Sequence, residues 1–202
     1  MKGLISVGIV EVDAKGLACP EPVIRTKKAL EGIPEGTVVT LVDNEIAREN
    51  VLKLARSRGY EAHYTAVEGG FSVVIEKNFA GPQEEALIDT HDLVILVTSS
   101  QLGNGDDKLG SILMKSFLYA LSEASPLPQR IFFLNSGVRL TAGGSDSLAS
   151  IQKMADQGVA IESCGICLDY YHLNDALAVG SVTNMYNVVE TVSQAKRVLT
   201  VG

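Results

Sequence analysis

The residues best suited to chemistry in this sequence are its three cysteines, Cys19, Cys164 and Cys167. A cysteine thiolate is a strong nucleophile and a good metal ligand. An odd, small number of cysteines in a chain of 202 residues is not typical of a secreted disulfide scaffold. We therefore expect free thiols in a reducing cytoplasm, where cysteine function is thiol chemistry or metal binding.

The first cysteine opens the motif Cys19-Pro20-Glu21-Pro22. Proline is favoured in the first turn of a helix, because the N–H group that it lacks has no partner there. The spacing predicts a helix over residues 20–31, with Cys19 at its N-cap or just before it. There the unpaired N–H groups and the helix dipole would stabilise a thiolate or a persulfide anion. The alternative is a cysteine that is simply packed at a helix start.

The other two cysteines form the motif Cys164-Gly165-Ile166-Cys167, directly after a predicted strand over residues 159–163. Ligands of an open α/β sheet bind outside the carboxyl ends of its strands. We expect two glycine-rich loops, residues 99–107 and 135–144, at the same edge. Cysteines separated by two residues can close a disulfide, or one can resolve a persulfide on the other. This pattern favours a redox or sulfur-relay role.

Two alternatives stay open for this pair. His172 extends the motif to a Cys-x2-Cys-x4-His pattern, but a zinc site lacks a convincing fourth ligand, and Cys19 would have to come from another domain. In the second alternative both thiols only pack at a strand-to-turn junction. The glycines around Gly103-Asn104-Gly105 match neither the Walker pattern nor the dinucleotide fingerprint. We therefore predict no organic cofactor and no metal.

Residues 1–77 predict one small domain that would position Cys19. Its strands are expected at residues 5–12, 37–42, 61–67 and 71–77, and its helices at residues 20–31 and 45–58. The order β-α-β-α-β-β predicts a two-layer sandwich, with two helices on one face of a four-stranded sheet. Residues 78–91 lack periodicity and predict a linker.

Residues 92–202 have a different order of predicted elements, in which strands and helices alternate. Strands are expected at residues 92–98, 130–135, 159–163, 178–182 and 198–201, helices at 107–123, 145–157 and 184–196, and a short turn or helix at 169–177. This order predicts a mainly parallel, doubly wound α/β domain.

One helix of this second half is apolar over more than one face. Its predicted core stripe consists of Leu109, Ile112, Leu113, Phe117, Ala120 and Leu121. Met114 and Leu118 widen the stripe, which indicates a second packed surface on this helix.

Composition excludes several classes of function. The formal net charge is −7 and no lysine-rich block is present, so nucleic acids and anionic membrane surfaces are not expected partners. The longest apolar run, about residues 93–97, is far too short to span a membrane. The first 12 residues do not have the pattern of a signal peptide. We expect a cytoplasmic protein.

Residues 12–24, VDAKGLACPEPVI, resemble the signature of the TusA/SirA-like sulfur carriers. The resemblance covers about the first 77 residues and implies the same β-α-β-α-β-β fold. It also implies that Cys19 accepts sulfur as a persulfide from a donor protein and hands it to an acceptor. Pro20, Glu21 and Pro22 would complete the motif, with the two prolines shaping its turn.

The second half resembles the DsrE/DsrF-like family, on the layout of its βα units and on a cysteine after an inner strand. Together with Val42-Asp43-Asn44-Glu45 and the sequence SCGICLD at residues 163–169, the whole chain resembles the fused YedF family. That resemblance implies a role in selenium metabolism, and the DsrE-like half implies homo-oligomers through the C-terminal domain.

The sequence therefore predicts a sulfurtransferase-like carrier of sulfur or selenium. Cys19 would carry the cargo, and the C-terminal domain would either receive it at Cys164 or Cys167 or regulate its delivery. Two rival functions remain. One is a regulatory or binding module without carriage. The other is a zinc or redox switch centred on Cys164 and Cys167.

Overall fold

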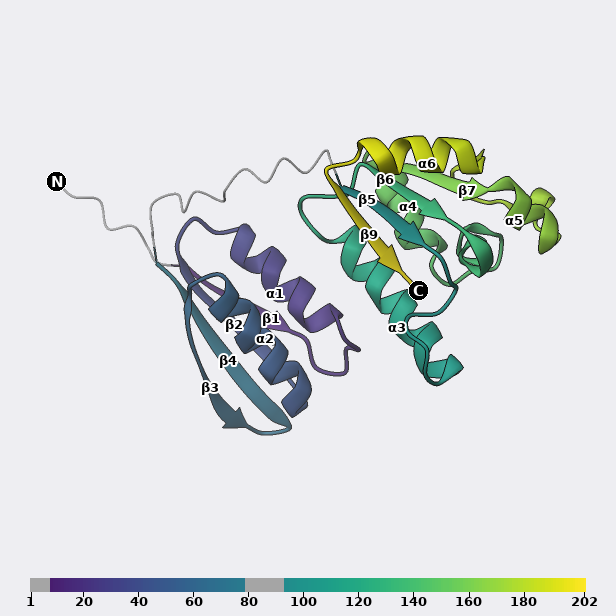
Figure 1. Cartoon of the computed structure of the whole chain (residues 1–202). Helices are drawn as coiled ribbons and strands as arrows, with labels where there is room; N and C mark the ends of the chain where they lie inside the picture. Colours follow the sequence, from purple (N-terminus) through teal and green to yellow (C-terminus); the bar gives the residue numbers. More distant parts are fainter. Residues whose placement is uncertain (1–7, 79–92) are drawn as a thin grey trace. The chain divides into compact units, whose positions relative to one another are not determined.

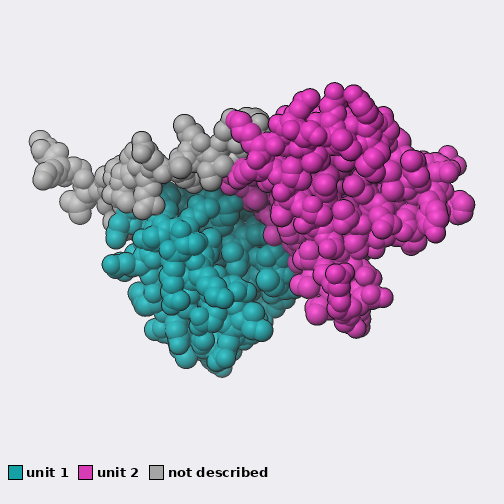
Figure 2. All heavy atoms as spheres, viewed as in Figure 1, with its two compact units in different colours: residues 1–84 teal, residues 85–202 magenta. Residues whose placement is uncertain are grey.

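We describe the protein from a computed structural model, which defines residues 8–78 and 93–202. The chain divides into two compact units, residues 1–84 and 85–202, which are coloured separately in Figure 2. The predicted linker at 78–91 lies, apart from residue 78, outside the described residues. So does the first part of the strand predicted at residues 5–12.

The N-terminal unit is a four-stranded sheet with two helices (Figure 1). Its elements are β1 (Ile9–Asp13), α1 (Glu21–Glu31), β2 (Gly36–Val42), α2 (Glu45–Ser57), β3 (Glu61–Val67) and β4 (Gly70–Lys77). The strand order is β1-β2-β4-β3. β1 runs parallel to β2, and the pairs β2–β4 and β4–β3 are antiparallel. This is the β-α-β-α-β-β order that the sequence predicts.

Both helices pack on one face of this sheet because its central strands alternate between buried and partly exposed residues. Val38, Thr40 and Val42 of β2 are buried on the helix side. Helix α2 contributes Val51 and Ala55 to the same core. The alternation of β2 has the period of a strand, and the pair in α2 has the spacing of a helical turn, so the two patterns together define a two-layer sandwich.

The C-terminal unit contains a five-stranded sheet (Figure 1). Its elements are β5 (Leu93–Val97), α3 (Asp107–Ser122), β6 (Arg130–Phe133), the 3-10 helix η2 (Asn135–Thr141), α4 (Leu148–Asp156), β7 (Ala160–Cys164), α5 (Gly165–Tyr170), the 3-10 helix η3 (Asn174–Ala176), β8 (Ser181–Thr183), α6 (Met185–Gln194) and β9 (Arg197–Val201). The strand order is β8-β7-β6-β5-β9, and every pairing is parallel. The predicted parallel α/β fold is confirmed.

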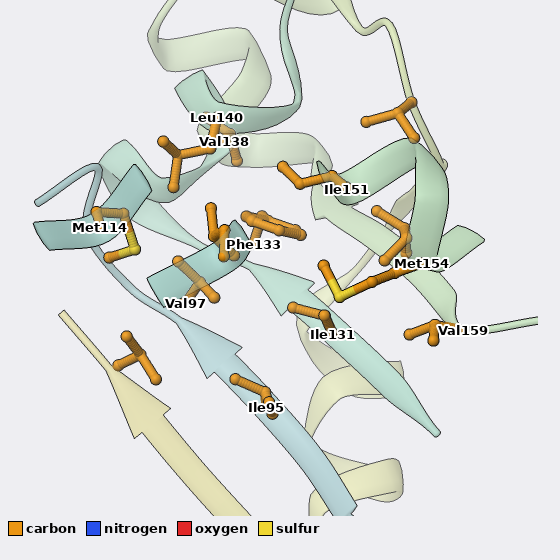
Figure 3. Packing of buried hydrophobic residues seen from close by; sticks show 14 of the residues in the cluster. Ile95, Val97, Met114, Ile131, Phe133, Val138, Leu140, Ile151, Met154 and Val159 are labelled. Carbon is orange, nitrogen blue, oxygen red and sulfur yellow. The ribbon is translucent and has the colours of Figure 1, made fainter. Parts of the chain in front are cut away.

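Helices cover both faces of this sheet. On one face, Ile95, Val97, Ile131 and Phe133 pack against α3 and α4, as the close-up in Figure 3 shows. On the other face, the neighbouring strand residues Val94 and Phe132 pack with Val188 of α6. Because consecutive strand residues point to opposite faces, a continuous apolar run builds both cores.

The core stripe predicted for α3 is right at Phe117 and Leu121, which pack against the core, and wrong in the first half of the helix. The fully buried line of this helix is Gly110, Met114, Leu118 and Ser122, whereas Leu109, Ile112 and Leu113 of the expected stripe are exposed. The helix has apolar side chains on most of its sides, so their periodicity alone does not predict which side is buried. Gly110 fits the buried face: a Cβ atom there would lie 3.1 Å from the Cβ of Gln101, so the glycine lets the helix approach the loop that precedes it.

Several boundaries in the C-terminal unit also differ from the prediction. The first part of the loop expected at residues 135–144 is the 3-10 helix η2. The helix expected from residue 145 begins at Leu148, without a side-chain cap from Ser145 or Asp146. The turn or helix expected at 169–177 begins earlier, as α5 at Gly165, which places Cys167 inside a helix. The weak strand expected at 178–182 is β8, residues 181–183. Asn, Ser and Gly favour both turns and helix caps, so such stretches do not fix a boundary.

In residues 8–78 and 93–202, no helix combines the length and the apolar character that crossing a membrane requires.

Candidate functional site

Cys19 is exposed and lies one residue before the N-cap of α1, which is Pro20. The peptide bond between the two residues is cis. The sequence placed Cys19 at the N-cap or just before it, and the second position is the one found. Pro22 occupies the second position of the helix, where its missing N–H costs no hydrogen bond.

The helix start offers fewer free donors to the sulfur of Cys19 than the sequence predicted. Pro20 and Pro22 have no N–H group. The Glu21 N–H donates to the Ala18 carbonyl oxygen at 2.9 Å, and the Val23 N–H donates to the Pro20 carbonyl oxygen at 3.1 Å. The expected cradle of unpaired N–H groups is therefore already used by the turn itself. What remains at the helix start is the field of the helix dipole.

A hollow lies beside Cys19. It lies between the start of α1 and the first turns of α2. Its lining residues are Leu17, Cys19, Pro20, Pro22, Val23, Asn44, Ala47 and Asn50. This lining is apolar apart from the thiol and two asparagine side chains. No charged side chain lines the hollow.

The loop that leads to Cys19 is fixed by Asp43, at the end of β2. The Asp43 carboxylate accepts the Gly16 N–H at 2.7 Å and the Asn44 side-chain amide at 2.8 Å. Gly16 has φ 71°, a left-handed conformation that favours glycine. These two hydrogen bonds, the Gly16 one first, hold the pKa of Asp43 below its ordinary value of 3.8. Asn44 in turn caps α2 by accepting the Ala47 N–H.

This arrangement predicts a titration at Gly16. The ionised form of Asp43 is the better acceptor, so its bond to Gly16 persists above pH 3.8 and is lost as the pH falls through the lowered pKa. The amide proton signal of Gly16 in NMR spectra should titrate with a midpoint below pH 3.8. The variant Asp43→Ala should abolish that titration, and Asp107→Ala, an exposed acidic residue in the other unit, should not. A wild-type midpoint at or above 3.8 would contradict this description of the loop.

Cys164 and Cys167 occupy two different environments at the carboxyl end of β7. Cys164 is the last residue of β7 and is 2% exposed, within the core of the C-terminal unit. Cys167 lies in the first turn of α5 and is partly exposed. Its Sγ accepts the N–H of Asn135 at 3.1 Å. The structure thus brings these two predicted site residues together and leaves Cys167 as the accessible thiol of the pair.

The two thiols interact. Burial raises the pKa of Cys167 above its ordinary value of 9.0, and so does a hydrogen bond with the Cys164 thiol, whereas the Asn135 N–H acts in the opposite direction. At neutral pH Cys167 is therefore mostly protonated and becomes more nucleophilic as the pH rises.

The loops at this sheet edge meet as expected, but through other residues. The Ser100 N–H donates to Ser136 Oγ at 3.1 Å, joining the loops after β5 and β6. Gly137, which the sequence analysis did not single out, lies so close to β5 that a Cβ atom would come 2.4 Å from the Val97 carbonyl oxygen. Of the expected glycine donors, the Gly143 N–H is used by the Ala176 carbonyl oxygen.

The described residues do not form the zinc site that the Cys164, Cys167 and His172 pattern allowed. Among the residues that the structure describes, no three His, Cys, Asp or Glu side chains gather as a metal site would require. His172 has φ 56° in the turn after α5.

Comparison with known proteins identifies the N-terminal unit. Residues 10–77 match the family described as "Sulfurtransferase TusA". The "Putative sulfur carrier protein MJ0990" of Methanocaldococcus jannaschii is 37% identical over 73 residues, which make up 35% of this chain and 97% of that protein. The chain belongs to the TusA family. The match includes Cys19 and every element from β1 to β4, so we call residues 8–78 the TusA unit.

Two solved structures are also similar to parts of the chain. The SirA-like protein from Desulfitobacterium hafniense is 42% identical to it, covering 37% of this chain and all of that one, with a TM-score of 0.33. The ychN protein from E. coli is 14% identical, covering 54% of this chain and 98% of that one, with a TM-score of 0.42.

Proposed function

We propose that this protein carries sulfur or selenium as a persulfide-type adduct on Cys19 and passes it to an acceptor thiol. The observation that carries this proposal is the exposure of Cys19 beside an uncharged hollow in a unit of the TusA family. The relative from Methanocaldococcus jannaschii is named as a sulfur carrier, which supports the same role here.

The proposed chemistry is a pair of thiol exchanges. The Cys19 thiolate attacks the outer sulfur of a donor persulfide, so that a new S–S bond forms on Cys19 and the donor leaves as a thiolate. An acceptor thiolate then attacks the outer sulfur of the Cys19 persulfide, and the Cys19 thiolate is regenerated. The sulfur atom moves without net oxidation or reduction. Neither step needs an organic cofactor.

The C-terminal unit supplies the acceptor in this proposal. Of its two cysteines we propose Cys167 as the receiving thiol, because Cys164 is 2% exposed and Cys167 reaches the surface. The sequence leaves both cysteines open as acceptors, and the difference in their burial is what favours Cys167. A separate donor protein would deliver sulfur to Cys19, and a separate acceptor protein would take it from Cys167.

The finer assignments remain part of the proposal. We infer a carrier domain at residues 1–77, a linker at 78–91 and a DsrE/DsrF-like domain at 92–202, as in the YedF family, with a role in selenium metabolism. We also infer homo-oligomers through the C-terminal unit. The exposed apolar side chains of α3, Leu109, Ile112 and Leu113, support an interface there.

The carrier proposal is tested by giving the full chain a protein persulfide or a selenium-loaded donor and mapping the added atom by mass spectrometry. The proposal expects the first adduct on Cys19, with the mass of one sulfur or one selenium atom. The rival function of a regulatory module expects no adduct on Cys19.

Accessibility alone predicts an order of alkylation. With iodoacetamide at neutral pH, Cys19 should be labelled first and Cys164 last, because a buried thiol reacts only when the structure opens locally. An opening that costs about 1.4 kcal/mol already slows the reaction about tenfold. Peptide mapping at successive times measures the order, and a denaturant should remove it. Labelling of Cys19 more slowly than both other cysteines would refute the prediction.

A further inference from the structure

Asn135 stands out at the candidate acceptor site because its backbone is strained and points at a reactive atom. It has φ 48°, a left-handed conformation that is uncommon outside glycine and that asparagine tolerates better than most residues. Its N–H group donates to the Sγ atom of Cys167 at 3.1 Å. Backbone strain that aims a donor at a nucleophile is a recurrent feature of functional sites.

The side chain of Asn135 is also held in place. The Tyr171 hydroxyl donates to Asn135 Oδ1 at 2.9 Å, and the Tyr171 N–H donates to the Cys167 carbonyl oxygen at 3.1 Å. The guanidinium of Arg139 lies 4.6 Å from the centre of the Tyr171 ring, a distance typical of a cation–π interaction. Cys167, Tyr171 and Asn135 thus form a closed ring of contacts that joins α5 to η2.

We propose that Asn135 is a positioning residue for Cys167, and that Tyr171 locks it so that its N–H donates to the Cys167 sulfur whenever that sulfur is an anion. This inference rests on the proposed role of Cys167 as the acceptor. It assigns to Asn135 and Tyr171 the stabilisation of the thiolate that attacks the incoming persulfide, without contact between Tyr171 and the cargo.

The charge balance around Cys167 makes this donor important. Burial and the Cys164 thiol both oppose ionisation of Cys167, and the Asn135 N–H is the group that favours it. The side chains of Tyr171 and Arg139 act on the sulfur through Asn135, because the Tyr171 hydroxyl contacts Asn135 and the Arg139 guanidinium contacts the Tyr171 ring. A hydrogen bond to an anion is stronger than one to a neutral group. The donor therefore contributes most at the moment when Cys167 reacts.

The test is the pH profile of Cys167 alkylation in the full chain, followed by peptide mapping. The variant Tyr171→Phe removes the lock and keeps the aromatic ring under Arg139. We expect alkylation of Cys167 near neutral pH to slow about three- to tenfold, the range that one hydrogen bond spans. At pH values well above 9.0 the rates should converge, because the thiolate then predominates in both proteins. A change in accessibility alone would persist at high pH.

Two further variants complete the experiment. Tyr170→Phe is the matched control, because Tyr170 is 76% exposed and its loss of a hydroxyl should leave the profile unchanged. Asn135→Gly keeps the left-handed backbone and removes the locked side chain, so it should shift the profile as Tyr171→Phe does, and the double variant should add little. A folded Tyr171→Phe protein with the wild-type profile, or an equal shift in Tyr170→Phe, would overturn the proposal. This experiment follows alkylation and not sulfur transfer, so failure of the carrier proposal would show in a separate assay.

Discussion

Replacing Cys19 by serine is expected to abolish the entry of sulfur into this protein. Serine has nearly the same size, and Cys19 is exposed before the N-cap of α1, so the variant Cys19→Ser should fold as the wild type does. A serine hydroxyl does not form a thiolate and accepts no sulfur by thiol exchange. After exposure to a limiting amount of donor persulfide, wild-type protein should carry the added atom on Cys19 and then on Cys167. The variant should carry it on neither.

The controls separate entry from transfer. Cys164→Ser and Cys167→Ser should both load Cys19 at the wild-type rate, because neither change touches the TusA unit. A mixture of Cys19→Ser chains with Cys167→Ser chains tests whether sulfur passes between molecules: an adduct on Cys167 in that mixture must come from another chain. If Cys19→Ser loads Cys167 as fast as the wild type does, Cys19 is not the entry point and the carrier proposal fails. Equal thermal unfolding of the variants excludes a folding defect.

The sequence was most informative for the TusA unit, where local patterns and tertiary packing agree. The β-branched residues of β2 predict a strand, and the apolar spacing of Ala47, Val51 and Ala55 predicts the buried face of α2; the structure has both. α3 shows the limit of this reasoning. Its apolar residues lie on all sides of the helix, and the close approach of Gly110 to the loop before it is a tertiary contact that the periodicity does not reveal.

For the candidate site, the sequence predicted which residues take part but not which hydrogen bonds they form. The motifs at Cys19 and Cys164 are visible as residue types and spacing. Whether the N–H groups after Cys19 are free depends on hydrogen bonds within the turn, such as that from Glu21 to Ala18, which spacing does not reveal. Asn135 was part of a predicted loop, and only the fold shows that its N–H reaches the Cys167 sulfur. The one signal in the sequence was an asparagine at the end of a predicted inner strand, where the glycine-rich loop begins.

Mild oxidation is expected to join Cys164 to Cys167 in most molecules and to leave Cys19 out of the bond. The two thiols already interact across the junction of β7 and α5, with Cys164 at the N-cap position and Cys167 in the first turn. A disulfide requires Cβ atoms about 3.5–4.5 Å apart, which two intervening residues at such a junction allow. Because the pKa of Cys167 is raised, the rate of oxidation should climb as the pH approaches and passes 9.0.

The same pair offers a second fate for sulfur that reaches Cys167. The Cys164 thiol, as a thiolate, can attack the inner sulfur of a Cys167 persulfide, which forms the Cys164–Cys167 disulfide and expels hydrosulfide. The two thiols then lose the two electrons that the departing sulfur gains. In Cys164→Ser this step is impossible, so the persulfide should persist on Cys167, and no hydrosulfide should leave. Cys167→Ser, the matched variant, should form no internal disulfide and should hold the cargo on Cys19.

Peptide mapping after oxidation and a sulfide assay after loading decide between relay and release. An internal disulfide together with hydrosulfide in the wild type, and neither in Cys164→Ser, would assign Cys164 as the resolving thiol. A major crosslink from Cys19 to Cys164 or Cys167 would instead contradict the local pair, because it would show that Cys19 reaches these sulfurs faster than they reach each other. Burial explains why Cys164 should react only after Cys167 is loaded. At 2% exposure, the Cys164 thiol is accessible to the neighbouring Cys167 sulfur and not to an external donor.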